Sequence, residues 1–124
     1  MQHLKAFILS EGDRYQDLLL GSQDIHPRKA PGSPEDGLDG WSFMMRTIEK
    51  DFCLLYFENQ AVTPDLSGFK PETTYSFQWY DPLTGDWKKI HPLNTDKQGN
   101  LQIPVFPNRE TVSKRDWAAK IIQQ

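Results

Sequence analysis

Large side chains alternate with small or polar ones through the middle of this chain, and this pattern constrains its fold most. Segment 41–47 reads Trp-Ser-Phe-Met-Met-Arg-Thr, and segment 74–80 reads Thr-Tyr-Ser-Phe-Gln-Trp-Tyr. A period of two places successive side chains on opposite faces of a β-strand. Between them lies the apolar run 52–57. The stretch therefore predicts strands of a half-buried sheet.

Turn residues separate these runs at short intervals. Segment 48–51 is a predicted hairpin turn, and the Asp-Pro-Leu-Thr-Gly-Asp segment 81–86 has Pro and Gly where a tight turn favours them. Pro64 would restrict segment 62–66 to the edge of a sheet. Further strands are expected at 87–90, 101–105 and 116–122; a helical turn is the alternative for the last segment, and we favour the strand. Six to eight short strands at this spacing predict an all-β fold, either a sandwich or a barrel, and we choose the antiparallel β-sandwich.

The residues before this region have a different character. Asp13 is a predicted N-cap for a short helix whose apolar face carries Tyr15, Leu18 and Leu19 and which ends near Gly21. The fifteen residues 26–40 contain three prolines and three glycines, which exclude regular structure. We therefore expect an N-terminal helical connector (1–25), a Pro/Gly-rich linker or loop (26–40) and the β-sandwich domain (41–124).

The aromatic side chains divide into predicted core and predicted surface. The core faces are expected to carry Trp41, Phe43 and Met45 on one strand and Tyr75, Phe77 and Trp79 on another. Tyr80 points opposite to Trp79, and Trp87 directly follows a turn, so these two are the candidates for an exposed platform on which a sugar ring stacks. The competing interpretation is that both pack across neighbouring strands.

Residue patterns typical of catalysis or metal binding are absent from the sequence. His3, His26 and His91 lack ligand spacing, and one cysteine cannot build a structural zinc site, so neither metal nor cofactor is expected. There is no Gly-x-Ser-x-Gly elbow and no phosphate-binding glycine loop. Cys53 is predicted to be a small buried hydrophobe.

Carboxylates are abundant, but nothing in the sequence forces the close pair that a retaining glycosidase needs. Asp81 and Asp86 are more simply explained as turn residues that bind their own backbone. A small independent enzyme would have to use Asp36, Asp39 or Glu58.

The charge and the hydropathy limit the partners and the location. A formal net charge of -3 gives no reason to expect nucleic acid or an anionic membrane surface. No apolar run approaches the ~18–20 residues that span a bilayer. The first ten residues lack the layout of a signal peptide. We therefore expect either a cytoplasmic protein or a piece of a longer exported one.

Three segments resemble a known domain. The run 37–47, followed by 50–58, looks like the C-terminal β-sandwich of bacterial glycoside hydrolases, and segment 79–87 is similar to the Trp-[Phe/Tyr]-[Asp/Asn]-Pro-x-Thr-Gly-x-Trp hairpin of such domains. Asp116-Trp117 resembles the pair before their last strand. The resemblance covers about residues 37–122. It is to the collagen-binding-like domain at the end of apiosidase- and agarase-like enzymes.

The resemblance implies a role without catalysis. In that family a TIM barrel precedes the sandwich and carries the catalytic carboxylates, so none can be assigned here, and the expected partner is the catalytic domain of the same parent polypeptide. The parent would be a periplasmic or extracellular polysaccharide-degrading enzyme. An exposed apolar patch near the N-terminus is then predicted. The alternative is an autonomous carbohydrate-binding module that uses Tyr80 and Trp87 to bind a polysaccharide.

Overall fold

A computed structural model describes residues 2–27 and 40–124 of the chain. Within these ranges the chain is mostly β-structure after a short helical start. The elements are α1 (Gln2–Ile8), a 3-10 helix (Leu9–Asp17), β1 (Leu18–Leu20), a 3-10 turn (Ser22–Asp24), β2 (Ile25–His26), β3 (Ser42–Thr47), β4 (Phe52–Phe57), β5 (Asp65–Leu66), β6 (Thr74–Tyr80), β7 (Trp87–Lys89), β8 (Leu93–Asn94), β9 (Leu101–Gln102) and β10 (Trp117–Gln123).

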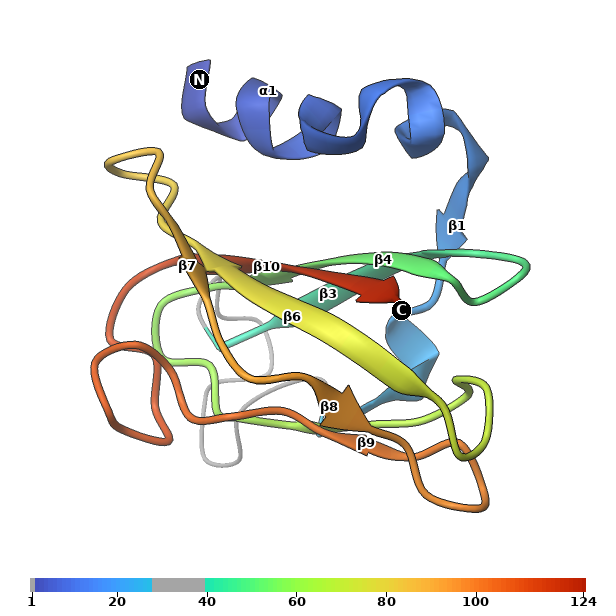
Figure 1. Ribbon diagram of the computed structural model, residues 1–124. Coiled ribbons are helices and arrows are strands. Elements are labelled where there is room, and N and C mark those ends of the chain that lie inside the picture. The colour runs from blue at the N-terminus through green and yellow to red at the C-terminus, as the bar shows by residue number, and fades with distance from the viewer. Residues whose placement is uncertain (1, 28–39) are drawn as a thin grey trace.

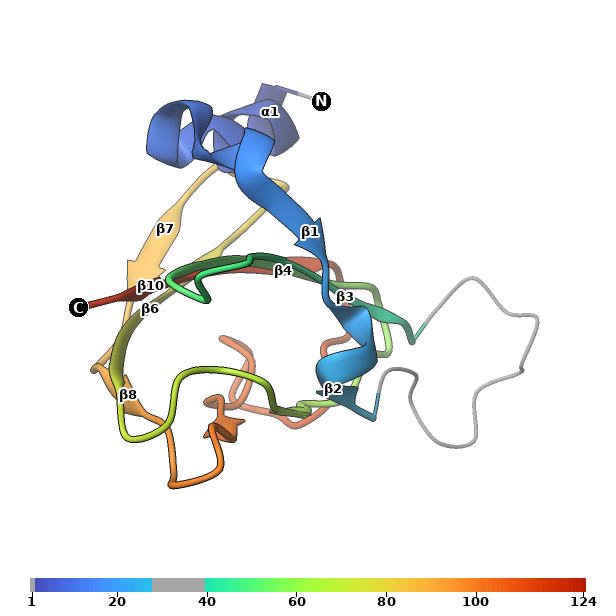
Figure 2. The ribbon, with the colours of Figure 1, turned by 90° about the vertical axis from the view of Figure 1, so that its right-hand side faces the viewer.

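The strands form two antiparallel sheets that face each other. The large sheet has the order β1-β3-β4-β10-β6-β7, with β8 also paired to β6, and the small sheet has the order β2-β5-β9. In Figures 1 and 2 the large sheet lies between α1 on one side and the small sheet on the other. The predicted all-β antiparallel sandwich with a short N-terminal helix is confirmed.

The main core fills the space between the sheets. Tyr75, Phe77 and Trp79 of β6 are at most 2% exposed, as predicted from their alternation. The closing strand β10 pairs with both β4 and β6, which confirms a strand at the end of the chain. Aromatic rings from β4, β6 and the loop after β9 contact one another, with Phe57 and Phe106 edge to face at 5.2 Å. Large rings thus build this core from few residues.

The predicted core face of β3 is wrong. Phe43 and Met45 are each 39% exposed, whereas Ser42 and Met44 are 1% exposed. Both faces of this strand carry a methionine, so the alternation alone does not decide which face is buried. Pairing with β4 places Met44 opposite Leu55, which belongs to the main core, and this register turns Phe43 and Met45 outward.

The helix begins and ends earlier than predicted. It spans Gln2–Ile8 as an α-helix and continues as a kinked 3-10 segment, while residues 18–20, expected in the helix, form strand β1 beside β3. Pairing with a neighbouring strand outweighs the helical preference of three leucines. Asp13 accordingly does not cap a helix that starts there.

The helical segment before β1 covers the outer face of the large sheet and closes a second, smaller core. Phe7 is 3% exposed and packs with Phe52, Leu54, Tyr80 and Ala118. Figure 2 shows the helical segment above the face of the sheet that is turned away from β2 and β8. The middle of the large sheet is therefore buried on both faces.

The predicted domain bounds stay a prediction. Strand β2 spans residues 25 and 26 and pairs with β5 in the small sheet, and residues 28–39 of the predicted linker lie outside the described ranges. Strand β5 starts just after Pro64 and lies between β2 and β9, so the expected edge position of this segment is wrong. Because Pro64 stands before the paired residues, it removes no hydrogen bond from the ladder.

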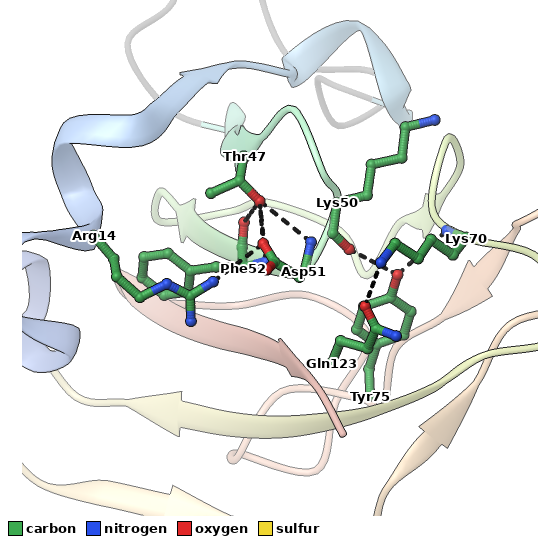
Figure 3. Close-up of polar contacts among 8 residues, drawn as sticks. All are labelled: Arg14, Thr47, Lys50, Asp51, Phe52, Lys70, Tyr75 and Gln123. Atoms are coloured by element: carbon green, nitrogen blue, oxygen red, sulfur yellow. Dashed lines mark hydrogen bonds and ion pairs between the residues drawn. The ribbon is translucent and has the colours of Figure 1, made fainter.

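Polar contacts at the β3–β4 turn fasten the N-terminal segment to the sheet (Figure 3). The Thr47 hydroxyl donates to Asp51 Oδ1 at 2.6 Å and accepts from the amides of Asp51 and Phe52. Arg14 pairs with the Asp51 carboxylate at 3.1 Å and lies over the Phe52 ring at 4.6 Å. The hydroxyl bond, followed by the Arg14 charge, lowers the pKa of Asp51 despite partial burial.

The same turn is also tied to the start of β6, and a further contact holds the end of β10 beside it. The Tyr75 hydroxyl donates to the Lys50 carbonyl at 2.8 Å, and Lys70 Nζ donates to Gln123 Oε1 at 2.6 Å (Figure 3). Burial raises the pKa of Tyr75, so this hydroxyl stays a proton donor.

In the described ranges no helix is both long and apolar enough to cross a bilayer.

Candidate functional site

Tyr80, one of the two predicted sugar-stacking residues, is not exposed. It is 1% exposed, lies against Phe7 with ring centroids 5.3 Å apart in a stacked arrangement, and contacts Trp87 at 4.6 Å. The expectation of an exposed Tyr80 is therefore wrong. The physical reason is the helical segment, which covers the outward face of β6.

Trp87 is half-buried, and much of its ring is in contact with other side chains. Phe7 lies 5.8 Å away, and the Lys120 ammonium lies 4.4 Å from the ring centroid. A cation over an indole face is attracted by the ring quadrupole. Tyr80 and Trp87 thus pack against each other across β6 and β7, as the competing interpretation has it. On the side toward the helix, Phe7 covers both rings.

Lys120 holds this cluster together at the centre of the sheet. It is 7% exposed and donates to Glu11 Oε2 at 2.8 Å, with Ser10 Oγ at 3.4 Å. A buried ammonium requires such a partner, because an unpaired charge away from water is costly. Strand β10 places Lys120 on the outward face, between the inward-facing Ala119 and Ile121. The ion pair explains why a lysine interrupts an apolar strand.

A small pocket lies beside the β6–β7 turn and contains three of the four tryptophans. Its volume is about 170 Å³, and its lining comprises Trp79, Asp81, Asp86, Trp87, Lys88, Pro107 and Trp117. The volume is below the ~300–1,000 Å³ of typical ligand pockets. It could hold at most a small ring or one end of a chain. We call it the tryptophan pocket.

Two buried donors next to this pocket lack partners among the described residues. They are the indole Nε1 of Trp117, a residue 8% exposed, and the Nε of Arg115. The Arg115 guanidinium lies over the Trp117 ring at 4.4 Å and pairs with Asp81. Unpaired buried donors are uncommon in folded proteins.

Asp81 is mainly a turn residue, as its sequence context predicts. Its Oδ1 accepts from the Leu83 amide at 2.9 Å and from Arg115. Burial raises the pKa of this carboxyl, but the Leu83 amide and the Arg115 guanidinium outweigh burial, so the pKa lies below its usual value. A carboxyl held ionised in this way is poorly suited to act as a general acid.

The other residues considered for chemistry have structural roles or lie outside the described ranges. Cys53 is 1% exposed, and burial raises the pKa of its thiol, as expected for a small hydrophobe. Glu58 accepts from the Trp41 amide at 3.3 Å. Asp36 and Asp39 lie outside the described ranges. Within the described ranges no group of three histidine, cysteine or acidic residues could hold a metal ion.

The most exposed apolar surface lies on β1 and β3. Leu20 is 81% exposed, and its cross-strand neighbour Met45 and nearby Phe43 are each 39% exposed on the same face. A hollow of about 480 Å³ at this surface is lined by Leu20, Ser22, Gln23, Phe43, Met44 and Met45. We call Leu20, Phe43 and Met45 the β1–β3 patch. The predicted apolar patch near the N-terminus is thus present, on two strands rather than on a helix.

Comparisons with known proteins indicate which larger proteins contain this fold. No family model matches the sequence, and no curated protein matches it. A solved glycoside hydrolase matches the structure with a TM-score of 0.63 and 13% identity. A glycoside hydrolase family 5 protein from Bacteroides vulgatus ATCC 8482 matches with a TM-score of 0.60 and 13% identity.

The lengths covered in these matches are unequal. Each match includes 98% of this chain but only 24% or 23% of the hydrolase chain. At 13% identity the likeness shows the fold alone. The chain thus has the fold of a small part of glycoside hydrolases, and it spans about a quarter of their length.

Proposed function

We propose that this chain is a non-catalytic accessory β-sandwich domain of a bacterial polysaccharide-degrading glycoside hydrolase. It packs against the catalytic domain of the same polypeptide, stabilises it, and is periplasmic or extracellular with its parent. The coverage of both hydrolase matches supports this proposal, as does the sequence resemblance of residues 37–122 to a C-terminal sandwich.

The observation that carries the proposal is the β1–β3 patch. Leu20, Phe43 and Met45 form a contiguous exposed apolar surface around a hollow whose other lining residues are uncharged. Such a surface is readily desolvated, and exposed apolar patches of this kind mark interaction sites. Burying a single leucine side chain contributes roughly 1.5–3 kcal/mol.

The edge of the large sheet reinforces this assignment. Strand β1 is at the end of the sheet order, and within the described ranges no strand pairs with its outer side. It consists of three consecutive leucines, of which Leu19 and Leu20 are 56% and 81% exposed. An unprotected apolar edge strand is an aggregation hazard unless something covers it. We assign the catalytic domain as that cover, since the matching chains are about four times as long.

The test is binding in trans. The chain and the catalytic domain encoded with it are purified separately, and their association is measured by sedimentation velocity. We expect association that is lost in the Leu20→Glu/Met45→Glu double variant. Leu83→Glu is the matched control, since Leu83 is 71% exposed in the β6–β7 turn, and this variant should bind like the wild type.

Two results would contradict the proposal. One is turnover of a polysaccharide by the isolated chain, and the other is association that the double variant leaves intact.

Carbohydrate binding at Trp87 stays a separate prediction, to be measured by tryptophan fluorescence titration of the wild type and Trp87→Ala. Burial removes Tyr80 from that prediction.

A further inference from the structure

A second and larger cleft lies on the opposite side of the molecule from the helix. Its volume is about 870 Å³, and residues of β2, β5, β8 and β9 line it. This volume falls within the ~300–1,000 Å³ range of ligand pockets. The cleft faces away from the main core, because its strand residues His26, Asp65 and Gln102 are exposed while their chain neighbours Ile25, Leu66 and Leu101 are buried.

The floor of this cleft is a row of polar side chains in register. His26 pairs with Asp65 across β2 and β5, and Asp65 pairs with Gln102 across β5 and β9. Adjacent strands lie ~4.8 Å apart, so the row is about 10 Å long. Three strands thus present one imidazole, one carboxylate and one amide on a single line. We call these three residues the polar row.

Most hydrogen-bonding capacity of the row is unused. The side chains of Asp65 and Gln102 make no hydrogen bond or ion pair with any residue that the structure describes, and His26 uses only Nε2, at 2.9 Å from Ser67 Oγ. Asn94, at the wall, accepts from the Thr74 hydroxyl through Oδ1, which leaves its amide NH₂ as a donor. The cleft therefore offers both donors and acceptors.

The rest of the lining serves to shape the cleft. Asp96 accepts from the backbone amides of Gln98 and Asn100, both at 2.9 Å, and from the Asn100 side chain. These bonds hold the β8–β9 turn and occupy the carboxylate. Pro92 is the exposed apolar residue of the lining. The groups open to a ligand are accordingly the polar row, Asn94 and the exposed His91.

The charges of the lining select the class of ligand. Two carboxylates and no lysine or arginine occur among the described lining residues, so a polyanion would be repelled. A divalent cation is disfavoured as well, because Asp96 is occupied and the described residues contain no group of three metal-binding side chains. A neutral ligand with many hydroxyl groups matches mixed donors and acceptors, since each hydroxyl both donates and accepts.

We propose that the cleft over the polar row binds a neutral oligosaccharide. Asp65 accepts from ring hydroxyls, Gln102 both accepts from and donates to them, and Asn94 adds a donor from the wall. The proposal extends the accessory role and does not depend on it, because the β1–β3 patch lies on strands of the large sheet, whereas the cleft lies over the small sheet. Figures 1 and 2 show the two sheets as separate layers. Both surfaces can be occupied at once.

The test is NMR titration of the full ¹⁵N-labelled chain with cellohexaose, xylohexaose, mannohexaose and hexagalacturonic acid. We expect at least one neutral hexaose to shift the amide signals of 26, 65, 94 and 102 in a saturable manner. Saturation should require roughly millimolar ligand, because no Trp, Tyr or Phe occurs among the described lining residues. The hexagalacturonate should leave these signals unchanged.

Variants separate this proposal from its rivals. Asp65→Asn/Gln102→Ala should weaken binding about tenfold, whereas Glu49→Ala, an exposed acidic residue in the β3–β4 turn, should not change it. The Leu20→Glu/Met45→Glu variant should bind the hexaose normally, so failure of the docking proposal is distinguishable.

Several outcomes overturn the proposal of an oligosaccharide cleft. One is that none of the three neutral hexaoses shifts the amide signals, and another is that the shifts are confined to the surroundings of Trp87. The others are equal binding of the hexagalacturonate and unchanged affinity in the Asp65/Gln102 double variant. The amide spectrum of each variant shows whether the fold is retained. Both changed side chains are exposed, so we expect that it is.

Discussion

Replacing Phe7 by alanine should undock the helical segment from the large sheet. Phe7 is 3% exposed and contacts Tyr80 and Trp87 at centroid distances of 5.3 and 5.8 Å. Removing a buried phenylalanine side chain costs ~3–5 kcal/mol in protein cores. We expect the low end, about 3 kcal/mol.

The assay is urea unfolding followed by circular dichroism and tryptophan emission. With a slope of ~2 kcal/mol/M, a loss of about 3 kcal/mol lowers the unfolding midpoint by roughly 1.5 M. The native emission should also shift to the red, because Trp87 loses its cover. Ile8→Ala is the matched control: Ile8 is the next residue, is 36% exposed, and should change the free energy of unfolding by well under 1 kcal/mol.

The reasoning would be refuted by equal midpoints for the Phe7→Ala and Ile8→Ala variants together with unchanged native emission. That result would mean that Phe7 is not packed on the outer face of the sheet. The second core and the burial of Tyr80 would then need another explanation.

Three further predictions concern charge and reactivity. Glu11→Gln leaves the buried Lys120 ammonium without its carboxylate and should lower the free energy of unfolding by about 2 kcal/mol, whereas Lys120→Met should be nearly neutral in the same urea unfolding assay. The folded-state pKa of Asp81 is depressed, so the stabilising contribution of this carboxylate is complete above pH ~4 and is lost as the pH falls through the folded pKa. Between pH 7 and pH 3 the thermal unfolding midpoint should therefore fall less in Asp81→Asn than in the wild type. Cys53 should react with a thiol reagent at pH 8 only when urea unfolds the chain, and rapid native labelling would contradict its burial.

Strands with a strict alternation or a clear turn were predictable from the sequence. The β6–β7 hairpin follows from Pro82 and Gly85 in its turn and from three aromatic residues at a period of two in β6. Strand β3 was harder, since methionines occupy both faces and only the pairing with β4 decides between them. Strand β1 was missed because its three leucines fit a helix equally well when considered alone.

The surroundings of the candidate site could not be predicted, because they depend on contacts between distant segments. Nothing near Tyr80 in the sequence reveals that Phe7 covers it. Lys120 in an apolar strand was a possible signal of a buried ion pair, but its partner Glu11 is 109 residues away. The polar row was equally hidden, since His26, Asp65 and Gln102 meet only through the register of the small sheet.

Hydrogen exchange tests the central claim, that the β1–β3 patch docks on a catalytic domain, most directly. Amide exchange of this chain is compared by mass spectrometry between the isolated form and the full parent polypeptide. We predict slower exchange in the parent for peptides covering 18–20 and 43–45, and unchanged exchange for the 81–86 turn. Identical exchange of 18–20 and 43–45 in both forms would contradict the claim.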